Sequence, residues 1–278
     1  MTLVPRALPM ISDPETARAL RSRWHRTRSL LLTSMVVLPF TLVLMCVSLA
    51  ALTVAADRDL AWWAFITVFA AAAHAIALAV WLRRDGSAEP QSWLPATGMM
   101  TGAQFLLGVV PGFCLAVSSS SGVGRTVAGA LLALAPVGLA VACTIAHQAH
   151  LTLLRPVIAE LGSTPLDLVL DEQLPAGGAV RVGIGSDVIE WTTWINGSRT
   201  DSNVAFSHIV EISAVGHAVV LRTASGRWTV PSTDPVLLYE LLTRRKALWD
   251  SRINAVVERE RQLYRDLLVH LSPLPIAE

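Results

Sequence analysis

The first half of the chain is dominated by long runs of apolar residues. Four of these runs contain no Asp, Glu, Lys or Arg: residues 30–56, 60–82, 97–117 and 126–150. A helix that crosses the hydrocarbon core of a bilayer needs about 20 predominantly apolar residues, and each run meets this length. The pattern therefore predicts an α-helical membrane domain of four transmembrane helices over residues 29–154.

From residue 177 the pattern changes to short alternations of apolar and polar residues, which are typical of half-buried β-strands. The dipeptide Asn196-Gly197 predicts a tight hairpin turn between two of these strands. Predicted strands cover residues 179–184, 188–195, 203–206, 209–214, 218–223 and 228–230. Together they predict an all-β meander of antiparallel strands that forms a barrel or a sandwich.

One face of this predicted meander is apolar and supplies the core. Within residues 188–195, Ile189 and Trp191 share a face, whereas Trp194 points the other way. Core positions are expected at Ile189, Trp191, Ile209, Ile212, Val219 and Leu221. The outward Trp194 either contacts a partner or the membrane, or is covered by the C-terminal segment.

A C-terminal helix closes the predicted β domain. Asp234 and Pro235 supply the N-cap and first-turn signals of a helix that runs over residues 236–249. The charged segment 251–271 continues as a helix, and its apolar residues lie near heptad spacing until Glu260 interrupts them. A coiled coil, packing against the β domain and packing on the membrane surface are all open for this segment.

Residues 1–28 are predicted to be a basic amphipathic segment on the cytoplasmic side. Residues 12–15 resemble a capping box with Pro14 in the first helical turn. The residues of this helix that are expected to contact the membrane surface are Arg18, Arg21, Trp24 and Arg28. Such an interfacial helix is attracted to anionic headgroups. A role for the same arginines in setting topology alone is an equal alternative.

Arginines flank the predicted spans unequally. Those before the first span are Arg6, Arg18, Arg21, Arg23, Arg26 and Arg28. Arg83 and Arg84 follow the second span, whereas the two other loops carry only Arg58 and Arg125. Because positive residues stay inside, both termini are predicted to be cytoplasmic, in a multi-pass protein of the cell membrane. A signal peptide cleaved near residues 54–56 is the competing interpretation, but the apolar run is roughly twice the usual length.

Three stretches of the β region resemble the bacterial pleckstrin-homology (PH)-like domain found on many membrane proteins. Residues 188–191 (VIEW) look like its second strand, and residues 204–212 look like its next conserved stretch, with Phe206 in the aromatic place. Residues 226–231 look like its entry to the closing helix. The resemblance covers residues 177–250 and implies a binding or scaffolding fold rather than a catalytic one.

These observations divide the chain into five predicted segments. They are a cytoplasmic basic segment (1–28), a four-span transmembrane domain (29–154), a linker (155–176), a PH-like domain (177–250), and a C-terminal helix and tail (251–278). The predicted fold is thus a helical membrane domain followed by a cytoplasmic all-β domain with a helical cap.

The sequence carries no motif of catalysis or cofactor binding, such as a P-loop, a dinucleotide fingerprint or a nucleophile elbow. His74 lies inside a predicted span, and without a carboxylate partner it is expected to pack rather than to relay protons. His147 and His150 share a helix face but lack a third metal ligand. Three cysteines in apolar runs are expected to be small buried hydrophobes: Cys46, Cys114 and Cys143. The prediction is no enzyme, no cofactor and no metal.

The expected function is a membrane-anchored scaffold or adaptor that presents the PH-like domain to a protein at the inner leaflet. The candidate partner patch is Trp194, Asn196 and Arg199, because an outward tryptophan beside an arginine is a frequent hot-spot pairing. Near the first hairpin Arg181 is the one cation, which disfavours headgroup recognition and favours a protein partner. Membrane lipids are also expected contacts, and self-association is open. The alternative function is a small oligomeric transporter or channel with a cytoplasmic regulatory PH-like domain.

Overall charge adds two points. The net charge of +1 gives no nucleic-acid signature, so nucleic acid is not an expected partner. Lys246 is the single lysine among 22 basic residues, and this bias indicates a high-GC genome such as that of an actinobacterium.

Overall fold

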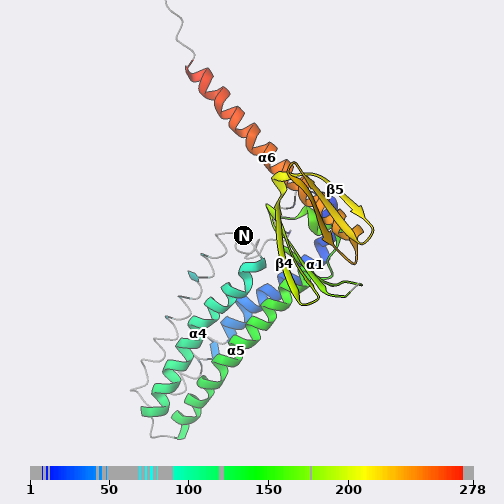
Figure 1. Cartoon of the computed structure of the whole chain (residues 1–278). Helices are drawn as coiled ribbons and strands as arrows, with labels where there is room; N and C mark the ends of the chain where they lie inside the picture. Colours follow the sequence, from blue (N-terminus) through cyan, green and yellow to red (C-terminus); the bar gives the residue numbers. More distant parts are fainter. Residues whose placement is uncertain are drawn as a thin grey trace, which may run out of the picture. The chain divides into compact units, whose positions relative to one another are not determined.

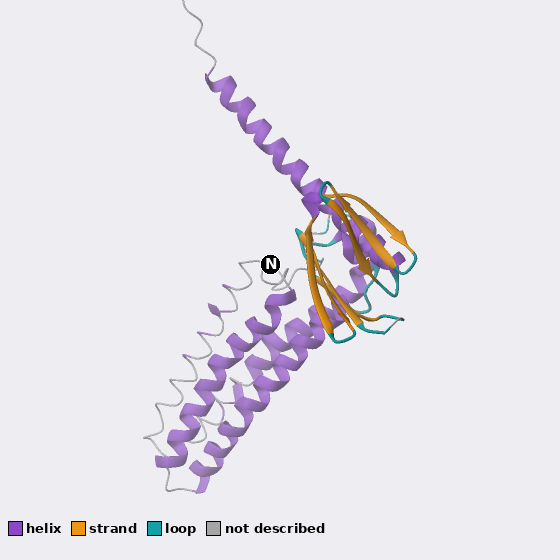
Figure 2. Cartoon of the chain, in the orientation of Figure 1, coloured by secondary structure: helices purple, strands orange, loops and turns teal. Residues whose placement is uncertain are grey.

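The computed structural model divides the chain into two compact units, Met1–Arg155 and Pro156–Glu278. Besides isolated positions between residues 8 and 80, the described parts are residues 13–41, 90–118, 122–175 and 177–271. The first unit is helical, and the second consists of strands followed by a long helix (Figures 1 and 2). The two units therefore differ in their secondary structure.

The first unit is a group of long helices. Its described elements are α1 (Pro14–Leu32), the π-helical turn η1 (Thr33–Val37), α4 (Pro90–Ser118) and α5 (Gly122–Leu154). The carboxylate of Asp13 caps α1, because it accepts hydrogen bonds from the backbone N–H groups of Glu15 and Thr16 at 3.3 and 2.9 Å. The N-terminal helix expected from the capping pattern is present, with Asp13 as its N-cap.

One face of α1 packs against α5. The residues buried on that face recur every three or four positions: Thr16, Leu20, Trp24, Thr27 and Leu31. On α5 the buried positions are mostly small, with Ala142, Ala146 and Ala149 fully enclosed. The Thr27 hydroxyl lies 3.5 Å from the carbonyl oxygen of Ala149. Small side chains let the two backbones approach closely.

The apolar character of the helical unit is clearest in α5. Among the residues that the structure describes, one helical segment, Gly124–Leu154, is long and apolar enough to cross a membrane. The third predicted span, 97–117, falls within the helix α4. Residues 30–41 of the first predicted span are described and helical, whereas most of residues 42–56 and most of the second predicted span lie outside the described residues. The N-terminal region is thus helical with one candidate span, and the four-span count stays a prediction.

The second unit contains two antiparallel sheets. Its elements are η4 (Ala159–Ser163), β1 (Leu168–Gln173), β2 (Ala179–Ile184), β3 (Val188–Ile195), β4 (Ser198–Ala205), η5 (Phe206–His208), β5 (Ile209–Val215), β6 (Ala218–Thr223), β7 (Gly226–Pro231) and α6 (Pro235–Leu271). One sheet has the order β1-β2-β3-β4 and the other β5-β6-β7. Figure 1 labels β4 in the first sheet and β5 in the second. The predicted meander is confirmed, and β2, β3 and β6 have the predicted bounds.

The predicted linker, 155–176, requires correction because it contains the strand β1. Leu168 and Leu170 alternate with exposed residues and are buried inside the unit. Leu168 pairs with Ile184 of β2, so the four-stranded sheet begins before the region that the PH-like resemblance covers. Pairing with β2 stabilises this short strand, and a sequence pattern does not reveal that pairing.

The two sheets and the first turns of α6 enclose one core. Of the six predicted core residues, Ile212 is half-buried. The other five are buried: Ile189, Trp191, Ile209, Val219 and Leu221. The rings of Trp191 on β3 and Trp228 on β7 meet edge to face at 6.1 Å and so join the two sheets. Leu238, Leu241 and Leu242 of α6 are fully buried. The unit is therefore a helix-capped antiparallel β structure.

α6 is one continuous helix that extends beyond the sheets. The Asp234 carboxylate accepts a hydrogen bond of 3.0 Å from the N–H of Leu237, as expected for an N-cap. Residues 251–263 are all exposed, and in Figure 1 this half of α6 runs away from the strands. The alternative in which this segment packs against the β domain is therefore wrong.

Candidate functional site

The three residues of the predicted partner patch lie together at one end of the β3–β4 hairpin. Asn196 and Gly197 have φ angles of 51° and 77°, as in a two-residue type I′ turn. The turn places Trp194 directly opposite Arg199, so their side chains lie on the same face of the sheet. Trp194 is 36% exposed, and Asn196 and Arg199 are exposed as well. The structure therefore brings the three residues together, and their role as a partner patch stays a prediction.

A glycine fixes the backbone behind Trp194. Gly178 has a φ of +99°, a conformation that favours glycine. It directly precedes β2, in the turn between β1 and β2, and lies next to the Trp194 backbone. A Cβ atom at this position would clash with the Trp194 carbonyl oxygen. The close approach sets the position of the hairpin end relative to β2.

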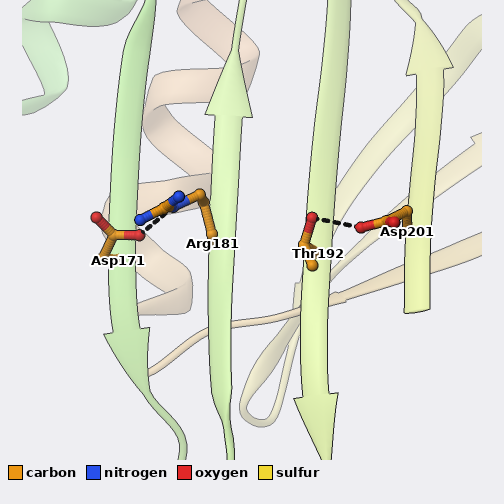
Figure 3. A network of polar contacts seen from close by, with 4 residues as sticks. All are labelled: Asp171, Arg181, Thr192 and Asp201. Carbon is orange, nitrogen blue, oxygen red and sulfur yellow. Dashed lines mark hydrogen bonds and ion pairs between the residues drawn. The ribbon is translucent and has the colours of Figure 1, made fainter. Parts of the chain in front are cut away.

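A row of polar side chains crosses the outer face of the four-stranded sheet (Figure 3). Arg181 Nε lies 2.6 Å from Asp171 Oδ1, and the Thr192 hydroxyl donates to Asp201 Oδ1 at 2.7 Å. Arg199 Nε lies 3.0 Å from the other oxygen of Asp201. The hydrogen bonds from Thr192 and Arg199 hold the pKa of Asp201 below its usual value. This face is therefore charged, solvated and internally paired.

A hollow of about 470 Å³ lies along β4. We call it the β4 groove. Its lining includes Glu190, Trp191, Asp201, Ser202, Asn203 and Trp228. The sequence did not indicate this feature, because Trp228 comes from the other sheet and only the tertiary structure brings it to β4.

A second hollow, of about 600 Å³, lies beside the β6–β7 turn. Arg222 and Arg227 stand opposite each other in the strand register, and Arg222 is 3.4 Å from Glu211 Oε2. All three charged side chains are exposed. This hollow offers solvated charges on an open strand surface.

Arg245 is the most deeply buried charged residue among those described, at 1% exposure. Its guanidinium donates to the carbonyl oxygens of Leu166 at 2.6 Å and of Gly185 at 3.1 Å. Burial lowers the pKa of Arg245 to about 10, against the opposing attraction of Asp167, so the group stays protonated at neutral pH. It joins α6 to two loops of the sheet.

The sequence contained a signal for this buried arginine that was missed. Arg245 follows Leu238, Leu241 and Leu242 at helical spacing and therefore shares their buried face. A charged residue on the apolar face of a helix indicates a buried, paired group rather than a surface charge.

In the helical unit the four residues predicted to contact the membrane surface differ in their exposure. Arg18 and Arg21 are exposed and Arg28 is half-buried, whereas Trp24 is only 2% exposed. The Trp24 ring packs on Trp93 of α4, with 6.5 Å between centroids. The expectation that Trp24 contacts the membrane surface is therefore wrong, because α4 and α5 cover its face of the helix.

Trp93 also joins α4 to α5. Its ring meets the imidazole of His150 edge to face at 6.4 Å, and His150 Nδ1 lies 3.3 Å from the carbonyl oxygen of Pro90. His147 points outward, so the two histidines do not form a joint site. Cys143 is half-buried with a free thiol. His74, Cys46 and the side chain of Cys114 lie outside the described residues.

Among the described residues, no group of three His, Cys, Asp or Glu side chains is placed to hold a metal ion. No family model, no curated protein and no solved structure matches the chain. The two small antiparallel sheets and the C-terminal helix are consistent with a PH-like domain.

Proposed function

We propose that this protein is a membrane-anchored scaffold or adaptor whose PH-like unit binds a protein at the inner leaflet. In this proposal the apolar helices of the first unit fix the chain in the membrane, with both termini in the cytoplasm. The β unit supplies a binding surface and carries out no chemistry. Membrane lipids are the expected contacts of the exposed Arg18 and Arg21.

The observation that carries the proposal is the exposed hairpin end with Trp194 opposite Arg199. Tryptophan and arginine are the residues most enriched at binding hot spots. A tight turn of fixed geometry presents them, so little conformational entropy is lost when a partner binds. The first unit contains the apolar segment Gly124–Leu154, which supports a membrane location.

A photo-crosslinking amino acid at position 194 of the full-length protein tests this function in intact cells. We expect a discrete crosslinked protein from position 194 and none from position 215. Val215 is the matched control, because it is an exposed apolar residue at a hairpin end of the other sheet. Trp194→Ala should reduce co-purification of the captured protein about tenfold or more, as the loss of a hot spot implies. Equal capture from both positions would contradict the proposal.

The transporter or channel alternative has one observation in its favour. Trp93 Nε1 and Thr97 Oγ1, one turn apart on α4, are buried polar atoms without a hydrogen-bond partner in the described part of the chain. Buried polar atoms of this kind in a helical unit are candidate contacts for a polar solute. Reconstitution of the full-length protein in liposomes decides between the functions. A solute flux that Thr97→Val abolishes and Trp194→Ala preserves would favour the transporter.

A further inference from the structure

The strand β4 forms one edge of the four-stranded sheet. Among the strands that the structure describes, it pairs only with β3. The two-residue turn makes Ile195 and Ser198 a hydrogen-bonded pair, and such pairs alternate along an antiparallel ladder. The bond from Phe206 N–H to the Asp187 carbonyl, 2.9 Å long, is in step with this alternation.

The alternation decides which backbone groups of β4 point away from β3. They belong to the residues between the hydrogen-bonded pairs, namely Arg199, Asp201 and Asn203. The same three residues line the β4 groove. The groove therefore contains a row of backbone donors and acceptors that β3 does not use.

The β4 groove reaches both faces of this edge. Glu190, Asp201 and Asn203 line it from the outer face of the sheet. Trp228, which is 40% exposed, lines it from the side of the core and rests against Trp191. A chain placed along β4 would thus meet carboxylates on one side and an indole on the other.

The charges of the groove favour a cationic occupant. Asp201 is bonded to Arg199, whereas Glu190 has no ion-pair partner among the described residues. Two carboxylates against one guanidinium leave a negative surface. An anionic lipid headgroup would be repelled here, and opposite charges across neighbouring strands attract.

We propose that the free edge of β4 takes an added strand from a partner protein whose sequence alternates basic and apolar residues. Alternate side chains of a strand point to opposite faces, so basic residues would lie beside Glu190 and Asp201 while apolar residues reach Trp228. Backbone hydrogen bonds along the edge supply affinity, and the alternating side chains supply specificity. This inference rests on the proposed scaffold function and names the chemistry of its partner.

A second copy of this chain is not the occupant that we propose. β4 has the sequence SRTDSNVA, in which polar residues predominate. Pairing two copies of β4 would bring two negative grooves together, and a charged edge strand of this kind resists self-pairing. Charge complementarity therefore selects a basic partner.

The test uses the full-length protein in detergent micelles and a fluorescent ten-residue peptide of alternating arginine and valine. A peptide of alternating glutamate and valine is the control. We expect the arginine peptide to bind at least about tenfold more tightly, because it complements Glu190 and Asp201. Backbone amide exchange in residues 198–205 should slow on binding, since the added strand bonds the free N–H groups.

A matched pair of variants isolates the backbone contribution. Asn203→Pro removes an N–H that faces the free edge and leaves the β3–β4 bonds intact, as an edge strand tolerates. Asn203→Ala keeps that N–H. We expect about a tenfold loss of peptide binding in Asn203→Pro and less than about a threefold change in Asn203→Ala. If Asn203→Pro lowers the melting temperature of the protein, amide exchange in residues 198–205 of the unmodified protein decides whether the peptide binds along β4.

Three results would overturn the inference. They are equal binding of the two peptides, protection at strands other than β4, and binding of the arginine peptide only when anionic vesicles are added. The crosslinking test at position 194 distinguishes this failure from failure of the proposed function. Capture of a protein there with no peptide binding to β4 would remove the strand-addition inference and leave the scaffold function standing. Peptide binding at β4 with no protein captured at position 194 would keep strand addition at β4 and remove the hairpin end as the binding surface.

Discussion

Arg245 illustrates how a single charged side chain organises the second unit. Its guanidinium replaces water with the carbonyl groups of Leu166 and Gly185, and a longer contact of 3.5 Å reaches Leu161. Removing the charge would relieve a desolvation cost, which the lowered pKa reflects. The carbonyl groups would lose their donors at the same time, and an unpaired buried polar group costs about 1–3 kcal/mol.

We expect the second effect to be larger, so Arg245→Met should lower the free energy of unfolding by about 3 kcal/mol. Arg259→Met is the control, because Arg259 lies on the exposed half of α6 and should change stability by less than about 0.5 kcal/mol. Urea denaturation followed by tryptophan fluorescence measures both. Equal midpoints for the two variants would show that the carbonyl contacts contribute no net stability.

At the scale of elements, β1 and α6 depend on each other. The Glu172 carboxylate on β1 accepts hydrogen bonds from the hydroxyls of Ser232 and Thr233 at 3.0 and 2.7 Å. These two residues precede α6, and Arg245 of α6 reaches back to the loop before β1. The boundary expected at residue 177 therefore cuts through a connected structure.

Fragments of the second unit test this dependence. A fragment of residues 156–271 should fold as a β-rich unit, whereas residues 177–271 should melt at least roughly 10 °C lower because β1 and its contacts are missing. Residues 156–250 provide the control, since the half of α6 that they lack is exposed. Circular dichroism during heating measures all three. Equal melting temperatures for fragments 177–271 and 156–271 would show that β1 is dispensable.

At the scale of the whole molecule, the arginine distribution predicts which side of the membrane each connection occupies. The connection between α4 and α5 should lie outside and the β unit inside. This prediction follows from charge alone, so it is tested by finding on which side of the membrane a given residue can be labelled.

Single cysteines introduced by Ser120→Cys and Ser198→Cys, in a background without native cysteines, measure this topology in intact cells. Ser198 is exposed at the β3–β4 turn, so an impermeant reagent should reach it only from the side of the membrane on which the β unit lies. A membrane-impermeant reagent should label position 120 and not position 198. Labelling at position 198 from outside would reverse the orientation and with it the inner-leaflet function.

The sequence by itself determined the features that depend on local chemistry. Alternation fixed the bounds of β2 and β3, because each of these strands has one buried face. Turns bound β6, in which the consecutive residues Val219, Val220 and Leu221 are all buried. Asn196-Gly197 fixed the hairpin turn, because both positions adopt positive φ. Together the turn and the alternation placed Trp194 outward beside Arg199.

Tertiary structure decided the features that depend on partners distant in the chain. β1 is held by pairing with β2, Trp24 is covered by Trp93, and Arg245 donates to carbonyl groups about 60–80 residues away in sequence. The β4 groove exists because Trp228 of one sheet reaches the free edge of the other. A pattern along the chain specifies which face of an element is apolar, but the packing of the folded chain determines what covers that face.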